Sequence, residues 1–167
     1  MLTRIVTFAA GVAIIGTLAP NMLSQKPTAA KSVVAEAPAD APAGYKKVIA
    51  VSADAFGHYS VEAVINGHSV PMLIDTGATY VALSEATARR LGIRLDPGRF
   101  VVRIGTANGV VGAAPVTLSE VTVGPIHVRN VEAVVVGGGG FDIDLLGMSF
   151  LNKLKYTAGG EQLVLAQ

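Results

Sequence analysis

The 167-residue chain contains no cysteine. It therefore has no disulfide bond, no thiolate nucleophile and no thiolate ligand for a metal ion. An excess of charge is also missing, because 13 basic and 12 acidic side chains leave a net charge of +1. A nucleic-acid partner bound through its phosphates is not expected for a chain with this balance.

Signals for a metal ion or a cofactor are absent as well. The histidines are scattered without ligand-like spacing, at His58, His68 and His127. The glycines at 105, 109 and 112 lack the spacing of a dinucleotide fingerprint, and no Gly-Lys-Ser/Thr follows a glycine run. Asp142-Ile143-Asp144 has no acid at the twelfth position of a calcium loop, so we interpret it as a solvated loop. We predict no metal and no cofactor.

An apolar segment opens the chain. Arg4 precedes an uninterrupted apolar run from Ile5 to Ala19, which Pro20 ends. Residues 1–23 suit either an uncleaved membrane anchor or a signal segment that is removed, with Thr28-Ala29-Ala30 as a cleavage site. A buried helix is a third alternative. Because the early charge is Arg4, we expect an N-terminus inside and the remainder on the exported, periplasmic-type side, or secreted after cleavage.

A linker separates this segment from the folded part. Residues 24–44 are rich in alanine and proline and show no sustained periodicity. We therefore expect one folded domain over residues 45–167, a length sufficient for a hydrophobic core.

Strand signals dominate that domain. The patterns predict strands at 47–53, 58–65, 68–75, 81–83, 100–104, 110–111, 116–123, 126–128, 131–136 and 162–166. Asn66-Gly67 and Asn108-Gly109 predict hairpin turns. Helices are predicted at 85–91, with Ser84 as the N-cap and Gly92 as the stop, and at 148–154. Many short strands and little helix indicate a closed or sandwiched β architecture.

One acidic residue stands in an unusual context. The apolar run of residues 71–74 leads directly into Asp75-Thr76-Gly77-Ala78. A carboxylate resists burial, yet this one ends a strand that reads as buried. Gly77 lets the backbone turn sharply behind the acid. Such a carboxylate is either functional or costly to the fold.

The order of motifs resembles the retropepsin-like aspartic proteases, in particular their bacterial, single-domain, membrane-anchored type. An apolar strand, Asp75-Thr76-Gly77, a short strand, a helix and a glycine-bearing hairpin are followed, some 70 residues later, by Leu145-Leu146-Gly147 before a helix. The resemblance covers residues 45–167. It implies an all-β, closed retropepsin-like barrel, the acid protease fold, with one or two short helices.

The resemblance also implies an activity. Peptide hydrolysis by water needs a general base and a general acid, and two adjacent carboxylates that share one proton supply both. This domain has one Asp-Thr-Gly, so the resemblance implies a homodimer in which Asp75 of each copy meets at the two-fold axis. We predict an aspartic endopeptidase acting on polypeptides. The alternative is a non-catalytic retropepsin-like module for peptide binding or assembly.

The resemblance assigns roles to further residues. Thr76, Gly77 and Ala78 support the active loop, with the Thr76 hydroxyl linking the two loops of a dimer and Gly77 presenting its amide to the carboxylate. Residues 103–112 resemble the flap that covers the substrate, with Thr106, Ala107, Asn108 and Gly109 at its tip. Leu146 and Gly147 resemble the apolar-glycine element behind the active loop. The terminal strand, 163–166, is an expected interface element.

Overall fold

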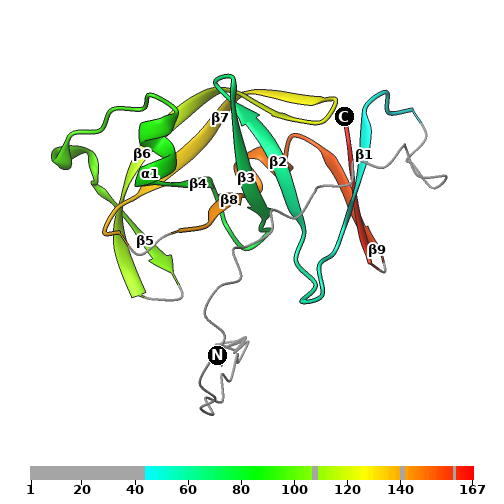
Figure 1. Cartoon of the computed structure of the whole chain (residues 1–167), viewed down its shortest axis with the longest axis horizontal. Helices are drawn as coiled ribbons and strands as arrows, with labels where there is room; N and C mark the ends of the chain where they lie inside the picture. The colour runs from blue at the N-terminus through cyan, green and yellow to red at the C-terminus, as the bar shows by residue number, and fades with distance from the viewer. Residues whose placement is uncertain (1–43, 107–108, 140–141, 160) are drawn as a thin grey trace, which may run out of the picture.

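The computed structural model describes residues 44–106, 109–139, 142–159 and 161–167. This part of the chain forms ten strands, two short α-helices and one 3-10 helix (Figure 1). The strands are β1 Val48–Ser52, β2 Ser60–Ile65, β3 His68–Ile74, β4 Val81–Ser84, β5 Val102–Thr106, β6 Gly109–Val123, β7 Ile126–Val136, β8 Asp144–Leu146, β9 Lys155–Gly159 and β10 Gln162–Ala166. The helices are α1 Glu85–Arg90, η1 Pro97–Arg99 and α2 Met148–Leu151.

Six strands close into a barrel. Their order is β2-β3-β8-β4-β7-β6, and β6 pairs back onto β2. The pairs β3–β8 and β4–β7 are parallel, and the other neighbours in the ring are antiparallel. β5 lies outside the ring and forms a hairpin with β6, at the lower left of Figure 1. The predicted all-β, closed barrel with short helices is confirmed.

A separate three-stranded sheet has the order β1-β10-β9. β10 is its central strand, and Leu163, Leu165 and Ala166 are buried in the core. Both edges of the terminal strand are therefore paired within one chain. β10 therefore has no free edge on which a second copy could continue the sheet, and the role of 163–166 as an interface element stays a prediction.

Local sequence explains the turns and the first helix. Asn66 and Gly67 both adopt positive φ, as a two-residue hairpin turn requires, and they join β2 to β3. Ser84 caps α1, because its side chain accepts a hydrogen bond from the Thr87 amide at 3.1 Å. Gly92 has φ of 73° directly beyond the helix end. These predictions are confirmed.

The structure departs from the predicted elements in several places. β6 runs unbroken through Ala113 and Ala114, which are fully buried and pair with β7, so tertiary pairing overrides their weak strand propensity. β7 likewise continues through Asn130, which adopts φ of 52°. β9 lies where no strand was predicted, and most of its residues are exposed, so the sequence carries no alternating pattern there. α2 ends at Leu151, short of the predicted residue 154.

Among the described residues, no helix is long and apolar enough to cross a bilayer. The predicted anchor or signal segment, residues 1–23, and almost all of the linker lie outside the described residues. Their assignment stays a prediction.

Candidate active site

Asp75 directly follows β3, which is one of the six strands of the barrel. β3 pairs in parallel with β8, and Ile74, the last residue of β3, lies opposite Leu146. Asp75 itself is only half-buried. The Gly77 amide donates a hydrogen bond of 2.8 Å to Asp75 Oδ1. The sequence-based expectation that Gly77 presents its amide to this carboxylate therefore matches the geometry.

The loop after Asp75 is bonded to the segment that joins β8 to α2. The Asp75 amide donates to the Leu146 carbonyl at 3.2 Å, the Met148 amide donates to the Ala78 carbonyl at 2.8 Å, and the Ser149 amide donates to the Thr79 carbonyl at 2.9 Å. Three main-chain hydrogen bonds thus hold the loop against a segment some 70 residues away. The structure brings together the two motifs that the sequence placed in one site.

Gly147 is the closest point of this contact. A Cβ atom at this residue would lie 2.2 Å from the Tyr80 carbonyl oxygen and 2.7 Å from the Ala78 carbonyl oxygen. Both distances are far below van der Waals contact, and both partners are backbone atoms. Glycine is therefore required here for close approach of two chain segments, which gives the Leu146-Gly147 motif a physical reason.

Ser149 completes the support of the loop and was not singled out from the sequence. Its Oγ accepts a hydrogen bond from the Val81 amide at 2.9 Å and donates one to the Glu132 carbonyl at 2.6 Å. The side chain thereby links α2, the start of β4 and β7. A serine two residues after a glycine carries no sequence signal of such a role, because both partners are main-chain groups distant in sequence.

Asp75 lies in a cleft of 950 Å³. Its lining includes Asp75, Gly77 and Ala78 of the active loop and Ile104, Gly105 and Thr106 of β5. Apolar side chains from the barrel, including Ala82, Val134 and Val136, also line the cleft. The cleft therefore combines apolar side chains with the carboxylate of Asp75, a composition typical of ligand sites.

The β5–β6 hairpin, which the sequence predicted, contributes Ile104, Gly105 and Thr106 to the lining of this cleft. Thr106 pairs with Gly109, and the Thr106 hydroxyl donates to the Gly109 carbonyl at 2.9 Å. Ala107 and Asn108 lie outside the described residues. The hairpin is thus observed, whereas its function as a flap stays a prediction. Thr76 is exposed beside the carboxylate.

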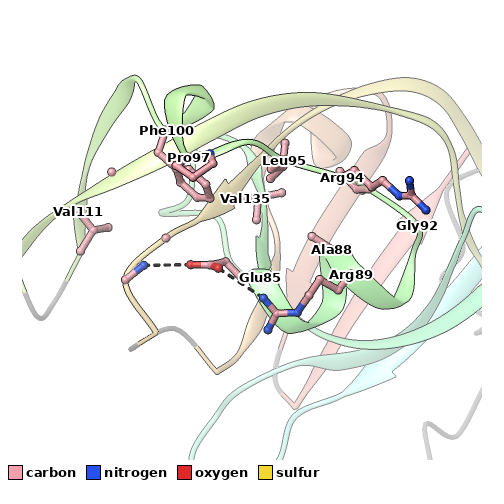
Figure 2. A pocket seen from close by; sticks show the side chains of 14 residues that line it. Glu85, Ala88, Arg89, Gly92, Arg94, Leu95, Pro97, Phe100, Val111 and Val135 are labelled. Carbon is pink, nitrogen blue, oxygen red and sulfur yellow. Dashed lines mark hydrogen bonds and ion pairs between the residues drawn. The ribbon is translucent and has the colours of Figure 1, made fainter.

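A second cavity, of 880 Å³, lies between α1 and the base of the hairpin (Figure 2). Three residues, Val111, Gly137 and Gly138, line both this cavity and the Asp75 cleft, so they form a wall that the two cavities share. The Gly138 amide donates to Glu85 Oε1 at 3.2 Å, and Glu85 Oε2 lies 3.5 Å from Arg89 Nη1 (Figure 2). The glycine wall is therefore held from behind by α1.

Asp144 differs from its prediction as part of a solvated loop. It is the first residue of β8 and is buried, with 6% of its surface exposed. Its Oδ1 accepts the Ser84 amide at 2.7 Å, and its Oδ2 accepts the Thr87 hydroxyl at 2.6 Å. A carboxylate with both oxygens engaged in this way positions the start of α1. Asp142 is exposed and lines the Asp75 cleft.

Among the residues that the structure describes, no three acidic or histidine side chains group as a metal site. Two described acidic residues line the cleft. The carboxylate of Asp75 is positioned by the Gly77 amide, and Asp142 is exposed.

Known proteins are similar to this chain in sequence, and a solved structure is similar to it in fold. The family model described as gag-polyprotein putative aspartyl protease matches residues 61–153. An uncharacterized protein in the cobV 5′ region of Sinorhizobium sp is 46% identical over 101 residues, which are 59% of this chain and 42% of that protein. Uncharacterized protein RP867 of Rickettsia prowazekii (strain Madrid E) is 38% identical over 108 residues, 65% of this chain and 45% of that protein. The chain thus spans less than half the length of these curated relatives.

A solved structure extends the similarity to the fold. The crystal structure of a retropepsin-like aspartic protease from Rickettsia conorii aligns with a TM-score of 0.63 at 32% identity. The alignment covers 71% of this chain and 98% of that one. The matched family segment contains both the Asp75 loop and the Gly147 segment that supports it.

Proposed function

Since the chain belongs to the gag-polyprotein putative aspartyl protease family and has a retropepsin-like fold, we propose that it is an aspartic endopeptidase. The observation that carries this proposal is Asp75. It is half-buried, oriented by the Gly77 amide, and lines a 950 Å³ cleft together with residues of the β5–β6 hairpin. A module that only binds peptide has no need of a carboxylate held in this position.

The proposed mechanism requires two carboxylates. One takes a proton from a water molecule, which then attacks the peptide carbonyl carbon, and the other gives a proton to the departing nitrogen. Two neighbouring carboxyl groups that share one proton perform both steps and titrate as a pair. One chain supplies one Asp-Thr-Gly loop. The second carboxylate is therefore proposed to be Asp75 of a second copy, related by a two-fold axis.

The proposed substrate is a polypeptide in extended conformation. The walls of the cleft combine apolar side chains with the exposed main chain of Gly105 in β5. Apolar pockets select side chains, while main-chain groups of a hairpin can hydrogen-bond any extended peptide. This combination supports an endopeptidase that recognises short apolar segments.

The test is cleavage of an unfolded protein by the full chain, across pH 4 to 8, beside the variant Asp75→Asn. We expect cleavage by the wild-type chain and a loss of at least about a thousandfold in the variant, because both carboxylates of the pair are then carboxamides, which cannot take up and give the proton. Circular dichroism checks that the variant keeps its fold. Equal cleavage by both proteins, or by neither at high concentration, would contradict the peptidase and favour a binding module.

We propose further that residues 1–23 anchor the chain in a membrane, with the protease domain on the exported, periplasmic-type side. The apolar run after Arg4 supports this. Extraction of membranes with alkaline carbonate tests it, since an anchored chain stays in the pellet and a cleaved, secreted chain does not.

A further inference from the structure

Phe56 is the most exposed of the large apolar side chains in the described residues, with 84% of its surface accessible. It lies in the connection between β1 and β2. A single exposed apolar side chain is ordinary on a protein surface and indicates nothing alone. Two further features distinguish Phe56. Hydrogen bonds fix the conformation of its loop, and the same loop is bonded to the residue that precedes Asp75.

Hydrogen bonds hold the Phe56 loop in one conformation. Asp54 Oδ1 accepts the amides of Phe56 and His58, each at 2.8 Å. The main chain adds a bond of 2.8 Å from the Asp54 amide to the His58 carbonyl and one of 3.0 Å from the Gly57 amide to the Asp54 carbonyl. The pKa of Asp54 is held below its ordinary value, and the hydrogen bond from the main-chain amide of His58 is the largest cause. The loop is therefore ordered before any partner arrives, which lowers the entropic cost of binding.

The same loop is attached to the active loop. The Ile74 amide, next to Asp75, donates to the Tyr59 carbonyl at 2.8 Å. In Figure 1 the β1–β2 connection turns at the lower edge of the molecule, and β3 runs toward the same side. Thr76 and Gly77 are exposed at the end of β3. The loop that carries Phe56 is thus bonded, three residues after Phe56, to the residue that precedes Asp75.

We propose that Phe56 is an anchor residue of the contact between two copies of this chain, with its ring packed against the second copy beside the paired Asp75 loops. Phe56 has this role only if the chain works as the dimeric peptidase proposed above. Ordered aromatic side chains near the centre of an interface carry much of its binding energy. Under two-fold symmetry each interface contains Phe56 twice, so one substitution removes two contacts.

The first test compares dimer dissociation constants by analytical ultracentrifugation of the full chain in mild detergent. Phe56→Ser is expected to raise the dissociation constant at least about tenfold, as for loss of an interface anchor. Phe56→Leu keeps an apolar side chain and is expected to stay much closer to wild type. Val101→Ser is the matched control, because Val101 is 72% exposed and lies in a different segment, directly before β5.

The second test needs no change in stability or activity. The chain has no cysteine, so the variant Phe56→Cys carries a single thiol. The rate at which this thiol reacts with a maleimide is expected to fall several-fold as the protein concentration rises through the dissociation constant. The thiol of Val101→Cys is expected to react at one rate throughout.

The outcomes separate this role from the proposed function. If Asp75-dependent cleavage and a dimer are observed, but Phe56→Ser dimerises like wild type and the thiol of Phe56→Cys reacts at a constant rate, the role of Phe56 is overturned and the peptidase stands. A wild-type chain that stays monomeric and inactive overturns both. Weaker dimerisation of Phe56→Ser, with native circular dichroism and activity recovered at high concentration, supports the anchor.

Discussion

Single residues determine the geometry around Asp75. The carboxylate is oriented by the Gly77 amide, and the loop that carries it is bonded to the segment from Leu146 to Ser149. Gly147 permits this contact, because any larger residue would collide with two carbonyl oxygens. Asp75 is thus the proposed reactive group, and Gly147 and Ser149 determine where it lies.

Gly147→Ala tests the need for close approach. Its Cβ would meet backbone atoms that cannot move without displacing the active loop, so we expect a loss of about 3 kcal/mol or more in the free energy of unfolding. Urea unfolding followed by circular dichroism measures it. Gly98→Ala is a control, since a Cβ there meets no atom within 4 Å. A Gly147→Ala chain as stable as wild type would show that the contact relaxes easily.

Ser149→Ala removes a hydroxyl that makes two hydrogen bonds to the main chain. We expect a loss of about 1–3 kcal/mol in the free energy of unfolding, because the Val81 amide loses its acceptor in a partly buried site. The same urea unfolding measures it. Ser149→Thr keeps the hydroxyl and should recover part of that loss. Equal stability of the alanine variant and wild type would mean that water replaces the hydroxyl.

At the level of secondary-structure elements, α1 connects the barrel to the rear of the cleft. Buried Asp144 holds its first turn through the Ser84 amide and the Thr87 hydroxyl. At the same end, Glu85 accepts the Gly138 amide and so supports the wall that the cleft shares with the second cavity. A six-residue helix is too short to be stable alone, so these contacts keep it in place.

Asp144→Ala leaves two buried donors without an acceptor. We expect it to lower the free energy of unfolding by about 2–4 kcal/mol, measured by urea unfolding, because each unsatisfied buried donor costs about 1–3 kcal/mol and water recovers part of it. Asp142→Ala is the matched control, since Asp142 is exposed. A small effect of Asp144→Ala would mean that α1 is held by packing alone.

Glu85→Ala tests the support of the cleft wall. Loss of one hydrogen bond to Gly138 is expected to raise KM for a peptide by up to about tenfold while changing kcat less, because Gly138 lines the proposed substrate cleft but makes no hydrogen bond to Asp75. Glu85→Gln retains an acceptor and should behave like wild type. A fall in kcat with unchanged KM would show that α1 acts on the Asp75 loop instead.

For the entire chain, the proposed activity depends on a second copy. Mixing wild type with an equal amount of Asp75→Asn is therefore expected to lower the activity to roughly half that of wild type alone, since half of the wild-type chains then pair with the variant. Peptide cleavage checks this when it is measured at a protein concentration above the dissociation constant of the dimer. Activity unaffected by the variant would indicate that each chain works alone.

Many of the turns, caps and strands could be predicted from the sequence, because residues close together in the chain determine them. Asn66-Gly67 adopts the positive φ that a two-residue turn needs, Ser84 caps α1, and the apolar run before Asp75 becomes β3. β9 and the continuity of β6 were missed because pairing with a neighbouring strand, and not side-chain alternation, produces them.

The sequence alone identified the all-β class, the Asp75 loop and the Gly147 segment, because glycine, turn residues and apolar runs act within a few residues of each other. It could not identify Ser149, the burial of Asp144 or the enclosed position of β10, because each depends on partners that are distant in the sequence. Folding brings those partners together, and their hydrogen bonds and burial then assign each residue its role.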